Sequence, residues 1–189
     1  MTKTLFTLRC HWKAMLGWGL AASLVGAGVA LLAAATPIGA EESEDFGRSI
    51  RDGIDRFQLW NACEPIALSV EDVDDAGVTR GLTREAIITA VRSRLRAARL
   101  YRGDETLPRL YVNVNVVEGS TAYCVSLEFI KWVSDPISGR GGRAVTWSAG
   151  SAGQGGAAFI LSVVSQRTDE FIDEYLRVNT SACRGLGQS

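Results

Sequence analysis

The chain has 189 residues, of which 47% are hydrophobic and 22% are charged, and its formal net charge is −1 at pH 7. Its 20 basic residues are balanced by 21 acidic residues, which argues against a general nucleic-acid-binding protein, because such proteins carry a marked basic excess. The length is sufficient for one ordinary domain and a targeting segment.

Near the start, residues 14–35 form an uninterrupted run without a charged side chain. Lys3, Arg9 and Lys13 precede this run, and small residues up to Ala40 separate it from an acidic stretch. This order is typical of an export signal that is cleaved after Ala40. The run is also long enough to span a bilayer, which needs about 20 residues, so a retained membrane anchor is the alternative. In both cases the remainder of the chain is expected to be exported.

The exported part has no histidine, because the only one, His11, precedes the uncharged run. Three of the 20 basic residues also lie before that run, which leaves 17 basic and 21 acidic side chains and a formal net charge of −4. Catalysis by Ser-His-Asp or Cys-His groups and most imidazole-based metal sites are therefore excluded. An enzyme would depend on carboxylates, tyrosines, cysteines or Lys131.

The pattern after Ala40 predicts residues 41–62 as an acidic lead-in and a short helix, followed by one domain over residues 63–189. We expect the lead-in to be disordered once the signal is removed. Helical spacing of apolar residues predicts the short helix, from Phe46 through Ile50 and Ile54 to Phe57. In the domain we expect a strand over 65–73, a helix from its N-cap Thr83 to about Arg99, strands over 110–116, 123–129 and 145–149, and a helix over 157–178.

Each predicted strand has one aliphatic face and one polar or small face, and two amphipathic helices are available to cover the aliphatic side. We therefore expect an α+β two-layer sandwich of order β-α-β-β-β-α, with a four-stranded, mainly antiparallel sheet and both helices on one face. The opposite face is either plain solvent-exposed sheet or a docking surface for a partner. Its predicted residues are Ser69, Tyr111, Asn113, Asn115, Cys124, Ser126, Glu128, Thr146 and Ser148.

Charge on the two helices suggests how they pack. The first carries a row of arginines, Arg92, Arg96 and Arg99, and the last carries Asp169, Glu170, Asp173 and Glu174. Like charges at this spacing destabilise an isolated helix, so we expect the two helices to lie side by side and to neutralise each other. The alternative is that the arginines face anionic lipid or the phosphates of an envelope polymer.

Three cysteines remain after the signal, and export favours disulfides. If the predicted elements alternate in direction, Cys63 and Cys183 lie at the same end of the domain and Cys124 at the other. A Cys63–Cys183 bridge is therefore favoured. Cys124 is then either a small core residue or a site of intermolecular pairing.

Three further motifs are weaker indications of function than the charge and cysteine patterns. Asp72, Asp74 and Gly77 match part of a calcium loop, but Ala76 and Thr83 stand where ligands are needed. An ordinary acidic turn before a helix is favoured, and no metal site is expected.

A glycine-rich stretch between a strand and a helix, Gly150, Gly153, Gly155 and Gly156, fits no nucleotide-binding spacing. A tight connection, or weak anion binding at the helix N-terminus, is favoured, and no cofactor is expected. Paired carboxylates such as Glu71 and Asp75 could serve a glycosidase, but the sequence does not place them in a cleft.

Several segments resemble a group of exported bacterial proteins of unknown role: those around Gly81-Leu82-Thr83, residues 93–101, residues 110–116 and residues 174–179. The element order from Cys63 to Cys183 resembles that of cell-envelope accessory domains of the lipopolysaccharide-assembly and curli-secretion lipoproteins. That resemblance implies a binding role in the envelope. The chain differs from those lipoproteins because it lacks their lipid-attachment cysteine.

The sequence therefore predicts a non-catalytic accessory protein that is periplasmic or secreted and acts through contacts with another envelope protein. It is expected to contact a membrane only if residues 14–35 are retained as an inner-membrane anchor. The alternative function is a histidine-free hydrolase that uses carboxylates on envelope sugars or peptides.

Overall fold

The computed structural model describes residues 40–103 and 106–185, so the predicted signal, including His11, lies outside the described residues. The chain divides into two units, Met1–Ile50 and Arg51–Ser189, and the packing described below is that of the second. Within the described ranges, the helices are too short or too polar to cross a membrane.

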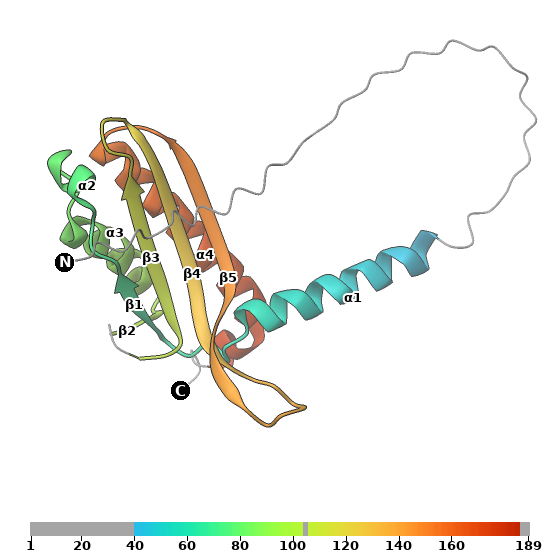
Figure 1. Cartoon of the computed structure of the whole chain (residues 1–189). Helices are drawn as coiled ribbons and strands as arrows, with labels where there is room; N and C mark the ends of the chain where they lie inside the picture. The colour runs from blue at the N-terminus through green and yellow to red at the C-terminus, as the bar shows by residue number, and fades with distance from the viewer. Residues whose placement is uncertain (1–39, 104–105, 186–189) are drawn as a thin grey trace, which may run out of the picture. The chain divides into compact units, whose positions relative to one another are not determined.

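Figure 1 shows the helices and strands of the described residues. They are α1 (Ala40–Leu59), β1 (Ile66–Val70), α2 (Asp75–Thr79), α3 (Arg84–Ala97), β2 (Tyr101–Gly103), β3 (Arg109–Val116), β4 (Ala122–Ser134), β5 (Gly141–Gln154) and α4 (Ala157–Gly185). Helix α1 begins at Ala40, so in the whole chain it includes the acidic lead-in as well as the predicted short helix.

The sheet has five strands in the order β2-β1-β3-β4-β5. Strand β1 runs parallel to both β2 and β3, whereas β3–β4 and β4–β5 are antiparallel. The α+β class is confirmed, but the sheet is mixed and has one more strand than expected. Helix α3 explains the parallel pairs, because it returns the chain to the end of the sheet at which β1 began.

The core lies between one face of the sheet and helices α3 and α4, which Figure 1 shows behind that face. Alternate strand residues such as Leu68, Val112 and Leu127 point into it, and α3 and α4 supply Ile87, Val91, Leu95, Ile160, Val164 and Phe171. Thr83 is the N-cap of α3, as predicted, since its hydroxyl accepts a hydrogen bond from the backbone N–H of Ala86 at 3.1 Å.

Helices α3 and α4 pack against each other, as the charges on the two helices predicted. Arg94 pairs with Asp169 at 3.0 Å. The guanidinium groups of Arg92 and Arg96 lie over the ring of Tyr101, 5.5 and 5.0 Å from its centre. Part of the arginine row therefore covers an aromatic ring of β2.

A β-bulge in β5 corrects one residue of the predicted open surface. Phe129 pairs with Trp147 and Ile130 with Val145, so Thr146 is the extra residue. The bulge interrupts the alternation on which the prediction depended. Thr146 is buried, and its hydroxyl donates to the Gln58 carbonyl of α1 at 2.7 Å, so the assignment of Thr146 to the open face is wrong.

The glycine-rich stretch is mostly strand and not a loop. Gly150 and Gly153 lie within β5. A Cβ at Gly153 would approach Tyr123 Oη to 2.9 Å, and one at Gly155 would approach Phe159 Cδ1 to 2.5 Å. These glycines therefore make room for aromatic rings.

Candidate functional site

The candidate site is the face of the sheet opposite α3 and α4, and we call it the open face. Strand register places its residues in rows that cross the sheet. One row runs Ser69–Tyr111–Glu128–Ser148, the next contains Asn113, Ser126 and Gly150, and the third contains Asn115, Cys124 and Ala152. Eight of the nine residues predicted for the open face thus share it, and Thr146 is the exception.

A chain of hydrogen bonds connects polar side chains on the open face. Glu71, directly after β1, accepts hydrogen bonds from the Tyr111 hydroxyl and, at 2.6 Å, from Asn113 Nδ2. Asn115 Nδ2 in turn donates to Asn113 Oδ1 at 2.6 Å. These bonds hold Tyr111, Asn113 and Asn115 in fixed orientations, so the face presents a preorganised acidic and amide surface.

Glu71 is the open-face residue that sequence reasoning missed as part of this surface. The signal was present, because Ser69 and Glu71 continue the two-residue alternation of β1. The backbone N–H of Glu71 donates to the Val112 carbonyl at 2.9 Å, which extends the pairing with β3 by one residue. Glu71 and Glu128 place two carboxylates around Tyr111 and Asn113, and Arg109 lies in the neighbouring row of the same face.

The pKa of Tyr111 is raised from its ordinary value of 10.0 to about 12. Burial is the main cause, and the hydrogen bond to the Glu71 carboxylate and the charge of Glu71 and Glu128 act in the same direction. Tyr111 is therefore a proton donor on this face at neutral pH.

This raised pKa leads to a pH-dependent prediction. The protonated phenol stabilises the fold fully below pH 10.0, and that contribution is lost as the pH rises through the folded value of about 12. An ultraviolet titration should show tyrosinate forming near pH 12, and Tyr111→Phe should reduce the amplitude of that step. Tyr175, whose burial also raises its pKa to about 12, should supply the remainder. An unchanged titration in Tyr111→Phe would contradict the assignment.

Cys124 lies half-buried on the open face. The alternation of β4 turns Tyr123 and Val125 into the core and Cys124 away from it. The alternative that Cys124 is a small core residue is therefore wrong.

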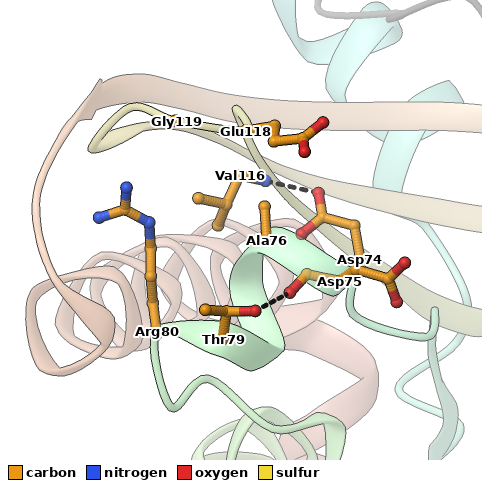
Figure 2. Close-up of a pocket in the computed structure, with 8 residues that line it drawn as sticks. All are labelled: Asp74, Asp75, Ala76, Thr79, Arg80, Val116, Glu118 and Gly119. Atoms are coloured by element: carbon orange, nitrogen blue, oxygen red, sulfur yellow. Dashed lines mark hydrogen bonds between the residues drawn. The ribbon is translucent and has the colours of Figure 1, made fainter.

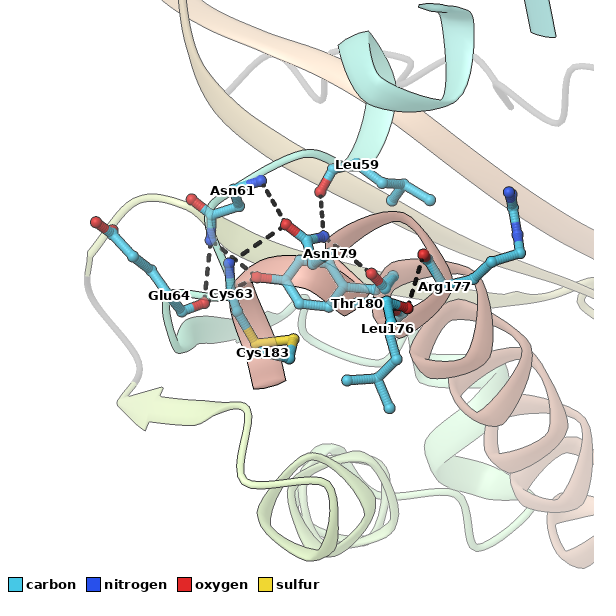
Figure 3. Close-up of a disulfide and its surroundings, with 10 residues drawn as sticks. Leu59, Asn61, Cys63, Glu64, Leu176, Arg177, Asn179, Thr180 and Cys183 are labelled. Carbon is cyan, nitrogen blue, oxygen red and sulfur yellow. Dashed lines mark hydrogen bonds between the residues drawn. A yellow bond between two sulfur atoms is a disulfide. The ribbon is translucent and has the colours of Figure 1, made fainter. Parts of the chain in front are cut away.

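Cys63 and Cys183, the pair that the element order favours, form a disulfide with their Cα atoms 5.1 Å apart. Figure 3 shows Asn179 of α4 beside this bond, surrounded by the segment that connects α1 to β1. Its Oδ1 accepts from the backbone N–H groups of Asn61 and Cys63, at 2.9 and 3.3 Å. Its Nδ2 donates to the carbonyls of Leu59 and Tyr175, at 3.0 and 2.9 Å. Asn179 was not singled out from the sequence, because no local pattern marks it.

A surface pocket of about 620 Å³ lies between α2 and the turn that follows β3 (Figure 2). Its lining residues are Asp74, Asp75, Ala76, Thr79, Arg80, Val116, Glu118 and Gly119. Asp74 accepts hydrogen bonds from the backbone N–H groups of Gly77 at 2.7 Å and Val116 at 2.8 Å. Asp74 is thus the N-cap of α2, which confirms the acidic turn that the sequence favoured at this point.

The structure does not bring the carboxylates of Glu71 and Asp75 into one site. Glu71 is bound to Tyr111 and Asn113 on the open face, whereas Asp75 lines the α2 pocket. In the described parts of the chain, no group of three or more His, Cys, Asp or Glu side chains is placed to hold a metal ion.

Comparison with known proteins does not assign the chain to a family. No protein-family model matches it, and no curated protein matches it at a significant level.

Proposed function

We propose that this chain is an exported, non-catalytic accessory protein of the bacterial cell envelope, and that it binds another envelope protein through the open face. The observation that carries this proposal is the preorganised surface of Glu71, Tyr111 and Asn113 on a face that α3 and α4 leave uncovered. The export signal predicted before Glu41 and the Cys63–Cys183 pair support an oxidising compartment outside the cytoplasm.

The chemistry of the open face favours a polar protein surface as its partner. Glu71 and Glu128 provide negative charge, Asn113 and Asn115 provide amide groups, and Tyr111 provides a flat ring with a hydroxyl group. Tyrosine is enriched at protein interfaces because it buries a large area with little loss of conformational entropy. The complementary surface would carry arginine or lysine side chains and backbone amides.

The test places a bulky cation at the centre of the open face. Ser126 lies between Asn113 and Gly150 in the register, so Ser126→Arg introduces both steric bulk and the wrong charge. In cells that express the parent or the variant, this protein is chemically cross-linked to its neighbours under oxidising conditions. The protein that becomes attached to it is then identified by mass spectrometry. We expect recovery of one envelope protein with the parent and a decrease on the order of tenfold or more with Ser126→Arg.

Ser93→Arg is the matched control, because Ser93 is exposed on α3 and does not belong to the open face. It should recover the partner as well as the parent does, and both variants should unfold at the same denaturant concentration as the parent. The proposal is wrong if Ser126→Arg recovers the partner undiminished, or if Ser93→Arg loses it to the same extent.

A further inference from the structure

The hairpin formed by β4 and β5 continues beyond the rest of the sheet. The pairing of β3 with β4 ends at Arg109 and Ile130, whereas β4 and β5 remain paired as far as Ser134 and Gly141. Figure 1 shows this two-stranded extension projecting past β3. Residues 131–144 therefore form a projection that the core does not require, and we call it the hairpin tip.

The turn of the hairpin tip holds an apolar side chain outward. Asp135 Oδ1 accepts a hydrogen bond from the Ile137 backbone N–H at 2.9 Å, and Asp135 Oδ2 accepts from the Ser138 hydroxyl at 2.5 Å. The Asp135 backbone also bonds to Arg140 and Gly139. Ile137 is 96% exposed on this ordered turn, and the nearest carboxylate is engaged within the turn itself.

An aromatic side chain and two cations lie on the same projection as Ile137. Trp132 is 61% exposed, and its indole lies over Gly141, where an added Cβ would collide with the ring. Arg143 is the cross-strand partner of Trp132, and both Arg140 and Arg143 are exposed. The hairpin tip therefore presents Ile137 on its turn, Arg140 where the turn closes, and Trp132 and Arg143 opposite each other further back on the projection.

We propose that the hairpin tip docks on a lipid bilayer. Ile137 enters the acyl region, the indole of Trp132 lies at the level of the headgroups, and Arg140 and Arg143 bind lipid phosphates. Tryptophan prefers this interface because its ring is apolar while its N–H needs a polar partner. Arginine is suited to phosphate because its planar guanidinium makes paired hydrogen bonds.

A bilayer fits the hairpin tip better than a protein pocket does. The surface projects from the sheet, with the apolar Ile137 exposed on its turn and with Arg140 and Arg143 on the same projection to meet lipid phosphates. The β3–β4 turn at the other end of β4 provides the contrast. There the exposed Val117 is followed by Glu118, and residues 117–121 include no arginine to bind a lipid phosphate, whereas Asp135 of the hairpin tip is accompanied by Arg140 and Arg143.

The first experiment identifies what touches the apex. A photoreactive p-benzoylphenylalanine replaces Ile137, and the protein, in the form in which cells export it, is illuminated with vesicles of phosphatidylethanolamine and phosphatidylglycerol. We expect a lipid adduct at position 137 and none when the same residue replaces Val117. Because the adduct is located by position, the result does not depend on whether residues 14–35 are retained. A lack of lipid adducts at 137, or equal adducts at 137 and 117, would overturn the proposal.

The second experiment measures the contact of Trp132 with lipid. Vesicles with bromine on the acyl chains quench tryptophan fluorescence, and the difference between the parent and Trp132→Phe isolates the Trp132 component. Ile137→Asp should reduce this component on the order of tenfold, because the apex loses its apolar side chain. Val117→Asp should leave it unchanged.

Arg140→Gln with Arg143→Gln should weaken the contact on vesicles that contain phosphatidylglycerol more than on phosphatidylcholine alone. These variants alter exposed residues, so the fold should be retained.

The proposal that the hairpin tip docks on a bilayer fails if the Trp132 fluorescence of Ile137→Asp is quenched as strongly as that of the parent. It also fails if position 137 cross-links to a protein in cells and to no lipid.

Discussion

Loss of the Cys63–Cys183 disulfide is expected to lower the free energy of unfolding by about 4 kcal/mol. The two cysteines are separated by 120 residues, so the bond closes nearly the whole domain into one loop. A loop of this length restricts the unfolded chain strongly, and the loss of that restriction favours unfolding. Urea unfolding of the exported protein, compared with Cys63→Ala/Cys183→Ala, measures the difference.

The two single variants provide the control. Cys63 is buried in the core, whereas Cys183 is only partly buried, so alanine removes different packing at the two positions. Either substitution alone breaks the bond, and each should therefore cost nearly as much as the pair. Single losses that add up to the loss of the pair would show that the cysteines stabilise the fold independently. Mass spectrometry of the intact exported protein should show a peptide containing Cys63 linked to one containing Cys183.

Local patterns were sufficient to predict most of the elements. Thr83 marked the start of α3 because a hydroxyl at an N-cap satisfies a free backbone N–H, and that bond depends on residues three apart. The alternation from Leu110 to Val116 gave strand β3 within one residue of its observed bounds. The open face was predicted for the same reason, since period-two alternation places Tyr111 and Asn113 on the same side.

Features that depend on distant partners could not be predicted in this way. Strand β2 has three residues, too few for a period, and it pairs only with Ile66 and Ala67. The bulge at Thr146 is set by the pairing with β4 and by the Gln58 carbonyl, 88 residues away in sequence. The extension of β4 and β5 into the hairpin tip was also missed, because the pattern weakens where both strand faces become exposed.

Asn179→Ala is expected to lower the free energy of unfolding by about 3 kcal/mol, close to the effect of losing the disulfide. Asn179 is fully buried, and its side-chain amide bonds to the backbone of Leu59, Asn61 and Cys63 as well as to Tyr175. Alanine would leave two N–H groups and a carbonyl of the α1–β1 connection without these partners. Such groups cost about 1–3 kcal/mol each when they are buried and unsatisfied.

The neighbouring Thr180 is the matched control, because its hydroxyl bonds only to carbonyls of its own helix, Leu176 at 2.8 Å and Arg177 at 3.0 Å. Thr180→Ala should change stability by less than about 0.5 kcal/mol. Asn179 and the disulfide attach the same segment to α4, so the losses in free energy of unfolding from removing each of them should not be additive. Once Asn179→Ala releases that segment, breaking the disulfide should lower the free energy of unfolding by a different amount than it does in the parent. Urea unfolding of the four combinations of Asn179→Ala with Cys63→Ala/Cys183→Ala measures this coupling. If Asn179→Ala costs no more than Thr180→Ala, the amide does not hold the connection, and the disulfide alone joins it to α4.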